Sequence, residues 1–252
     1  MRELFAVRIA AGGLILALGA SIALAQTKMT DSEASFNAGL AHLRENRPAL
    51  ALEQFRKAIK EDPKNAYAYK GLGLTYAQLG KLSDAVASFR KALELNPYYV
   101  DVRNDLGTAL VLSGKRAEGK AEFLAAFNDP TNPTPEISAR NLGQAYLEEK
   151  NYREAGNWFR TSFTRNKSYP DPYLGFADAV GALGHPDEAV APLELALKEV
   201  PGQPDLLVAL GQAYYKTGRF TEARSRLEEA ARRDPAGSAG RRANELIKNF
   251  PK

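Results

Sequence analysis

Small residues recur along this chain at a nearly constant interval, and this repetition constrains the fold more than any other feature of the sequence. Successive members of the first column are 34, 34, 36, 34 and 34 residues apart; the column consists of Gly39, Gly73, Gly107, Gly143, Ala177 and Gly211. A second small column has the same gaps and consists of Ala51, Ala85, Gly119, Ala155, Ala189 and Ala223. Four residues after each of these stands a bulky residue, namely Phe55, Phe89, Phe123, Phe159, Leu193 and Leu227. The aligned columns predict six copies of one structural unit.

Each copy is predicted to be a pair of antiparallel helices. Apolar residues fall at helical spacing in two stretches of every copy, and one turn-forming position separates the two stretches. That position holds Asn46, Gly80, Gly114, Lys150, Gly184 and Gly218. Antiparallel helices approach closely only where a side chain is nearly absent, and the opposing Phe or Leu fills the remaining space. The pattern therefore predicts an all-α solenoid of six helix-turn-helix units.

Acidic residues and prolines predict the limits of the second helix in each copy. The acidic residues suit the positive end of a helix dipole, and they are Asp84, Glu118, Glu154, Glu188 and Glu222. Proline lacks the N–H that a helix needs to continue its hydrogen bonds, so a proline is expected to end the second helix. These closing prolines are Pro63, Pro97, Pro201 and Pro235. Beyond the last copy, residues 238–252 are expected to form a capping helix and tail. Its apolar residues Ala243, Leu246 and Ile247 can cover the end of the stack while Arg241, Arg242, Asn244 and Glu245 meet water.

The interval lengthens to 36 between the third and fourth copies, within "DPTNPTPEISARNLG" (residues 129–143). Pro130, Pro133 and Pro135 replace the single closing proline there. We expect the preceding helix to end by Asp129, an extended linker to follow, and the next helix to begin near Pro135 or Glu136. The insertion is either a tolerated loop or a change of pitch that separates two halves of three copies and reshapes the groove between them. We prefer the second interpretation.

The first 25 residues have the three parts of a secretory signal peptide. Arg2 and Arg8 precede the uncharged stretch "IAAGGLILALGASIALA" (residues 9–25), which ends in small residues before Gln26. Cleavage there would leave an exported, periplasmic chain with a short linker at 26–31. The alternative is an uncleaved membrane anchor, because the stretch approaches the roughly 20 residues that a spanning helix needs.

Composition excludes several classes of function. The 34 Lys+Arg are interleaved with 30 Asp+Glu and form no basic stripe with aromatic residues, so no nucleic-acid partner is expected. The chain has no cysteine, so disulfides, thiolate metal sites and a lipidated N-terminal cysteine are all absent. The two histidines, His42 and His185, have no metal or catalytic spacing. We therefore predict no enzyme, no cofactor, no metal and no small-molecule substrate.

These columns resemble the tetratricopeptide repeat (TPR) family, and "AYKGLGLTYAQLGKLSDAVASFRKALELNP" is close to its ideal unit. The resemblance implies a right-handed solenoid in which the first helix of each repeat lines the concave side. It places the six repeats at 32–65, 66–99, 100–135, 136–169, 170–203 and 204–237. Some family members clamp a terminal carboxylate with a basic and asparagine set. Here Leu74 and Asp105 follow Lys70 where that clamp needs amides, so this ligand is not expected.

The outward faces of the first helices are the candidate partner-binding surface. Amide side chains pair with both the N–H and the C=O of an extended peptide, and apolar neighbours add contact area. The predicted contact residues are Phe36, Leu40, Tyr67, Lys70, Leu74, Asn104, Thr108, Arg140, Asn141, Gln144, Asp178, Gln212 and Tyr215. By register, Asp105, Leu174 and Val208 belong to the same faces. The expected partner is a protein or an extended peptide; the alternative is a merely solvated face.

A narrower resemblance is to the PilF/PilW/Tgl-type proteins of type IV pilus biogenesis. It rests on a signal sequence followed by six repeats, and on "NDPTNPTPEISARNLGQAYLEEKNYREA", which is similar to their mid-chain linker and the Asn-Leu-Gly-x-Ala-Tyr after it. The resemblance implies a role in assembling or stabilising the outer-membrane secretin pore, with a secretin subunit as partner. The alternatives are a general envelope adaptor or co-chaperone for outer-membrane or cell-wall enzymes, and an enzyme or enzyme accessory module.

Overall fold

The computed structural model describes residues 30–250, which form thirteen α-helices and one short 3₁₀-helix and no strand. The predicted signal peptide (1–25) and all but the last two residues of the predicted linker lie outside this range. In chain order the helices are α2 (Asp31–Arg44), α3 (Pro48–Glu61), α4 (Ala66–Gln78), α5 (Leu82–Leu95), α6 (Val100–Leu112), α7 (Arg116–Asn128), α8 (Pro135–Glu148), α9 (Tyr152–Arg165), α10 (Asp171–Ala182), η1 (Pro186–Ala189), α11 (Val190–Glu199), α12 (Pro204–Lys216), α13 (Phe220–Arg233) and α14 (Ser238–Lys248).

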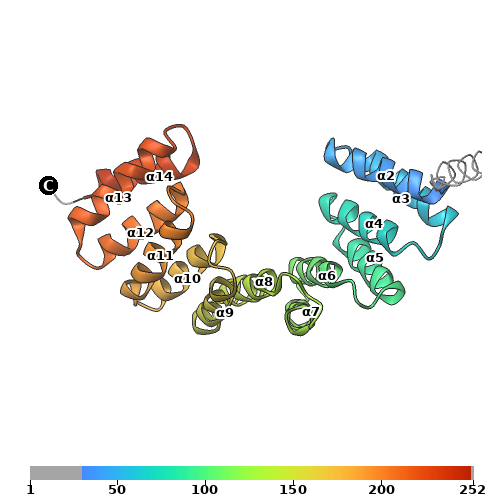
Figure 1. Ribbon diagram of the computed structural model, residues 1–252, viewed down its shortest axis with the longest axis horizontal. Coiled ribbons are helices and arrows are strands. Elements are labelled where there is room, and N and C mark those ends of the chain that lie inside the picture. Colours follow the sequence, from blue (N-terminus) through green and yellow to red (C-terminus); the bar gives the residue numbers. More distant parts are fainter. Residues whose placement is uncertain (1–29, 251–252) are drawn as a thin grey trace, which may run out of the picture.

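Consecutive helices pack as hairpins, and the hairpins stack into an open arch (Figure 1). At the middle of the arch α6 and α8 lie on the inner side while α7 and α9 lie outside. Alternate helices also touch along the inner side, since α2 contacts α4 and α8 contacts α10. The prediction of an all-α solenoid is confirmed, and the first helices form its concave surface.

Phe55 and Phe159 each fill a space that two glycines leave empty. A Cβ atom placed on Gly39 would lie 2.7 Å from the Phe55 ring, and one on Gly71 would lie 2.4 Å from it. Phe159 is held in the same way between Gly143 and Gly175. The ring therefore joins the helix pair of its own repeat to the first helix of the next repeat. Full burial of such a ring stabilises the fold by roughly 1.5–3 kcal/mol.

The turn between the two helices of each repeat is left-handed at its central residue. Positive φ angles occur at Asn46 (56°), Gly80 (71°), Gly114 (85°), Lys150 (59°), Gly184 (86°) and Gly218 (78°). These are the six turn positions that the sequence predicted. A left-handed residue after the last helical turn lets the chain reverse while the final carbonyls remain hydrogen-bonded.

The predicted helix ends are largely confirmed, with one exception in the fifth repeat. The closing prolines follow α3, α5, α11 and α13 by two residues. Glu188, expected to open an α-helix, lies instead in η1. Pro192 explains the difference because it has no N–H to donate to the Glu188 carbonyl, so the first turn tightens into a 3₁₀-helix.

The insertion between the third and fourth repeats is folded rather than extended, which corrects the prediction for residues 129–134. The helix limits are as expected, since α7 ends at Asn128 and α8 begins at Pro135. Between them the Asp129 carboxylate accepts from the Thr131 amide and hydroxyl at 2.8 and 2.6 Å, which lowers the pKa of Asp129. The Asn132 amide donates to the Ala126 carbonyl at 2.7 Å. Short Asp and Asn side chains build such turns by bonding the backbone two residues on.

The helices remain packed across this insertion. A buried cluster of Phe123, Leu142 and Ala145 joins α7 to α8, and α6 contacts α8 directly. The change of pitch that we inferred from the insertion stays a prediction.

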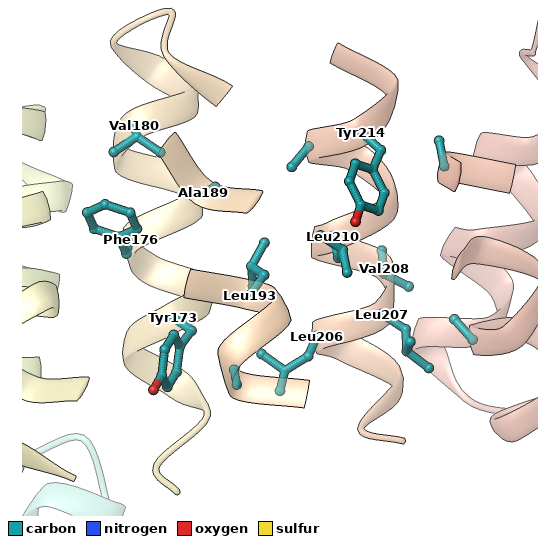
Figure 2. Close-up of a cluster of buried hydrophobic side chains, with 14 of the residues drawn as sticks. Tyr173, Phe176, Val180, Ala189, Leu193, Leu206, Leu207, Val208, Leu210 and Tyr214 are labelled. Carbon is teal, nitrogen blue, oxygen red and sulfur yellow. The ribbon is translucent and has the colours of Figure 1, made fainter. Parts of the chain in front are cut away.

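The largest part of the core lies in the last three repeats (Figure 2). Tyr173, Phe176, Leu193, Leu206 and Leu210 are fully or almost fully buried between α10, α11 and α12. At the end of the stack α14 packs against α13, with Ala243 buried and Leu246 and Ile247 partly buried. Its four predicted polar positions, 241, 242, 244 and 245, are exposed. The capping role is therefore confirmed.

None of the helices between residues 30 and 250 combines the length and the apolarity needed to cross a bilayer.

Candidate partner-binding face

The N-terminal part of the concave face is aromatic. Phe36 of α2 lies 6.2 Å from Tyr67 of α4, and Tyr67 meets Tyr99 edge to face at 5.3 Å between ring centroids. Tyr67 is 57% exposed, whereas Phe36 and Leu40 pack partly against the core of the first repeat. Leu74 packs partly against the core of the second repeat. Of the predicted apolar contact residues, Tyr67 thus offers the most surface to a partner.

Lys70 is engaged within the chain. Its ammonium lies 3.5 Å from the Asp101 carboxylate and 5.1 Å from the centre of the Tyr99 ring. Burial raises the pKa of the Tyr99 phenol to about 12. At neutral pH the Tyr99 phenol is therefore uncharged, and it lies beside Lys70 and Asp101.

Asn104 and Asp105 follow Asp101 on α6, and the charges of Lys70 and Asp101 act on Asp105. The Asn104 Oδ1 atom is buried and accepts no hydrogen bond from residues 30–250. Burial raises the pKa of Asp105 to about 6, with a smaller rise from Asp101 and an opposing effect of Lys70. One turn later Thr108 is exposed and donates its hydroxyl to the Asn104 carbonyl at 3.0 Å.

The centre of the face is a polar rim around a small pocket. Arg140 of α8 donates to the Asn141 side chain at 3.2 Å and to Asp171 at 3.4 Å, while Gln144 donates to Glu148 at 3.1 Å. A cavity of about 100 Å³ lies between α6 and α8, with these polar groups and Thr108 around it. Its apolar lining is Val111, Leu112, Phe123 and Ala145. The structure therefore brings four of the predicted contact residues together.

The C-terminal part of the face is more closed. Asp178, Gln212 and Lys216 line a pocket of about 40 Å³, and desolvation raises the pKa of Asp178 against the opposing charge of Lys216. Tyr215 packs on Phe250 at 4.9 Å and helps to line a separate cavity of about 250 Å³ beside α14. Tyr215 therefore faces the cap rather than the main groove.

Val208 is the one residue of the predicted faces that the structure places in the core. It is 2% exposed and belongs to the cluster between α10, α12 and α13, so it cannot contact a partner. Val208 lies on α12, which contacts α10, α13 and α14. Leu174, at the equivalent position one repeat earlier, is only partly buried.

The sequence analysis did not single out Tyr99, Asp101 or Leu112 as contact residues. Tyr99 lies in the loop that leads into α6, outside the helical columns from which the contact residues were chosen. Leu112 is 65% exposed at a position where the neighbouring repeats have Gln78 and Glu148. A leucine at an otherwise polar, solvent-facing position was the signal that could have identified it.

No group of three or more His, Asp or Glu side chains in the described part of the chain is arranged to hold a metal ion. His42 lies on α2 and His185 in the turn before η1, so the two histidines belong to different repeats.

Known proteins share this architecture. PilW, a widely conserved type IV pilus biogenesis factor, has a crystal structure that matches with a TM-score of 0.69 and 24% identity, covering 83% of this chain and 96% of that chain. Pseudomonas aeruginosa pilF matches with a TM-score of 0.69 and 22% identity, over 87% of this chain and 98% of that chain. YrrB, a TPR protein with an unusual peptide-binding site, matches with a TM-score of 0.57 and 21% identity, over 78% and 99% of the two chains. At these identities the likeness shows the fold alone.

Sequence-family models extend the comparison. No curated protein matches the chain. Three tetratricopeptide repeat models match residues 21–100, 67–201 and 182–243, and the second of these spans more than half of the sequence. Together with the helix pairs, the left-handed turns and the glycine-phenylalanine contacts, this coverage shows that the chain belongs to the tetratricopeptide repeat family.

Proposed function

We propose that this chain is an exported, non-enzymatic scaffold that holds an extended segment of a protein in its concave groove. The observation that carries the proposal is the set of amide and charged side chains at the centre of the groove, Arg140, Asn141 and Gln144, around a pocket of side-chain size. Amides can pair with both backbone groups of an extended peptide, and the apolar pocket can take one of its side chains. Tetratricopeptide repeats are typically protein-interaction modules rather than enzymes.

We further propose a secretin subunit of the type IV pilus machinery as the partner. Three features favour it: the shared fold with PilW and pilF over most of their length, the mid-chain proline-rich insertion, and the signal peptide that the sequence predicts for the first 25 residues. A general envelope adaptor would use the same groove for other proteins, so the identity of the captured protein separates the two roles.

The test is capture of the secretin from envelope extracts by the mature chain. The variant with Arg140→Ala, Asn141→Ala and Gln144→Ala is expected to bind at least about tenfold more weakly, because it loses central polar contacts. Its melting temperature should stay close to that of the unmodified chain, since the exposed Arg140–Asp171 pair contributes little stability. The matched control is Arg153→Ala with Asn157→Ala, two exposed residues on the outer helix α9.

Unchanged secretin binding by the triple variant would move the site away from the centre of the groove. Recovery of other envelope proteins but no secretin, with intact pili in a deletion strain, would favour the adaptor. Export is tested separately by mass spectrometry of the purified chain, which should begin at or next to Gln26. A mass that includes residues 1–25 would indicate an uncleaved anchor.

A further inference from the structure

The pocket at the centre of the concave face has a size that restricts what it can hold. It lies between α6 and α8, on the inner side of the arch (Figure 1). A closed apolar cavity of about 150 Å³ holds a benzene molecule, so this pocket of about 100 Å³ takes roughly four carbon atoms. A leucine or isoleucine side chain has that size, whereas a phenylalanine ring exceeds it. The apolar lining consists of Val111, Leu112, Phe123 and Ala145.

The pocket includes a position at which the preceding repeat has a leucine. Leu74 of α4 directly follows Gly73 of the small column and packs partly against the core of the second repeat. Thr108 holds the equivalent position on α6, after Gly107, but it is exposed and donates its hydroxyl to the Asn104 carbonyl at 3.0 Å. The third repeat therefore lacks the aliphatic side chain that the second repeat provides from within the chain.

Hydrogen bonds fix the two amide side chains at the rim of the pocket. Arg140 donates to Asn141 at 3.2 Å, and Gln144 donates to Glu148 at 3.1 Å. A guanidinium can only donate and a carboxylate can only accept, so the Asn141 oxygen and the Gln144 amino group are the engaged ends. The Asn141 amino group and the Gln144 oxygen have no partner among residues 30–250. The rim thus offers a donor and an acceptor one helical turn apart, which complement the C=O and N–H groups along one edge of an extended peptide.

We propose that this pocket is a subsite for a leucine or isoleucine side chain of the partner's extended segment, whose backbone is held by Asn141 and Gln144. The inference rests on the proposed function and adds a requirement on the partner's sequence: an uncharged aliphatic residue where the segment crosses the centre of the groove. A charged side chain would lose its hydration against the apolar lining. An alanine would leave most of the pocket empty.

The test uses three peptide probes, titrated into the mature chain and followed by NMR: acetyl-Ser-Leu-Ser-amide, acetyl-Ser-Ala-Ser-amide and acetyl-Ser-Phe-Ser-amide. We expect the leucine probe to bind at least about tenfold more tightly than the alanine probe, because its longer side chain buries more apolar surface. The phenylalanine probe should bind at least about threefold more weakly than the leucine probe, because its ring is too large. The largest shifts should lie at 108–112 and 141–145. Equal binding of the leucine and alanine probes, a preference for phenylalanine, or shifts centred elsewhere would overturn the proposal.

One variant fills the pocket from within the chain. Thr108→Leu places a leucine where Leu74 stands one repeat earlier, so the preference for the leucine probe over the alanine probe should fall to about twofold or less. Thr164→Leu is the matched control. Thr164 is also exposed and donates its hydroxyl to a carbonyl of its own helix, but it lies on the outer helix α9. A leucine preference that survives Thr108→Leu, or that is lost equally in both variants, would contradict the assignment.

A second variant tests the amides. Asn141→Asp keeps the oxygen that faces Arg140 but replaces the free amino group. It is expected to weaken the leucine and alanine probes by the same factor, at least about threefold, because the lost contact is to the backbone. Asn157→Asp adds the same charge at an exposed residue of α9 and is the control. A change in the leucine-to-alanine ratio without a common loss would show that Asn141 does not hold the backbone.

The probes contain no secretin sequence, so their result is separate from that of the capture experiment. A chain that captures a secretin through the centre of the groove but shows no leucine preference loses this subsite alone. A chain that prefers the leucine probe but captures no protein keeps the subsite and loses the scaffold proposal.

Discussion

Phe159 shows how one side chain joins two repeats. A Cβ atom on Gly143 would lie 2.7 Å from the ring, and one on Gly175 would lie 2.4 Å from it, both closer than packed carbon atoms allow. The ring is 1% exposed and has little room to move aside. The glycines are therefore needed for space, although each weakens its helix by about 1 kcal/mol relative to alanine.

Gly175→Ala is expected to destabilise the chain by about 1–3 kcal/mol, because the new methyl group overlaps the Phe159 ring. Gly156→Ala is the control. Its methyl group would meet Phe176 at 3.9 Å, an ordinary contact, so it should be neutral or stabilising by up to about 1 kcal/mol. Urea unfolding of both variants measures the difference, and equal effects would show that close packing is not what requires Gly175.

Asp105→Asn should stabilise the chain at pH 8 by about 1–3 kcal/mol, since it removes a carboxylate that is costly to bury. The folded pKa of Asp105, about 6, lies above its ordinary value of 3.8. The folded state therefore holds this proton more tightly than the unfolded state, and this residue's contribution to stability falls as the pH rises from about 4 to 6. The gain from the substitution should be full above pH 6 and disappear below pH 4. Urea midpoints from pH 3.5 to 8 test this, and a gain that does not change with pH would contradict it.

At the scale of the elements, each helix hairpin turns at one residue with a left-handed backbone conformation. In two repeats this turn residue is not glycine but Asn46 or Lys150. Lys150 has φ 59°, a conformation that costs an ordinary L-residue roughly 1–2 kcal/mol. Lys150→Gly should raise the free energy of unfolding by about 1 kcal/mol, and Gly114→Ala, with nothing near its missing side chain, should lower it by a similar amount. Thermal unfolding compares them, and opposite signs in the two variants are the required result.

Features that depend on residue type within one repeat were predictable from the sequence. The turn positions, the small columns and the closing prolines are of this kind, because each acts through its own backbone or through one neighbouring helix. The 3₁₀-turn at Pro186–Ala189 was not predicted, although Pro192 that causes it is visible in the sequence. The folded insertion was also missed, because its prolines suggested an extended chain while the Asp129 and Asn132 side chains determine the turns.

At the scale of the whole molecule, the groove combines residues that no single column contains. Thr108, Arg140, Asn141 and Gln144, which the columns assigned to the contact face, line one pocket in the structure. The columns could not place Tyr99, which lies in the loop before α6, or show that Val208 is buried in the core. Whether such a residue is exposed or buried depends on how neighbouring repeats and the cap pack against one another. It therefore follows from the assembled stack and not from the repeat pattern.

The stack also predicts how far the effect of a destabilising substitution extends, because each of the described repeats contacts only its neighbours. Ala243→Asp places a charge at a fully buried position of α14 and should loosen the cap. Hydrogen exchange should accelerate strongly in α12 to α14 and little in α2 to α7, because stability in such a stack is a sum of neighbouring interfaces. Asn244→Asp adds the same charge at the adjacent exposed residue and is the control. Uniform loss of protection along the whole chain would instead show that the six repeats unfold as a single cooperative unit.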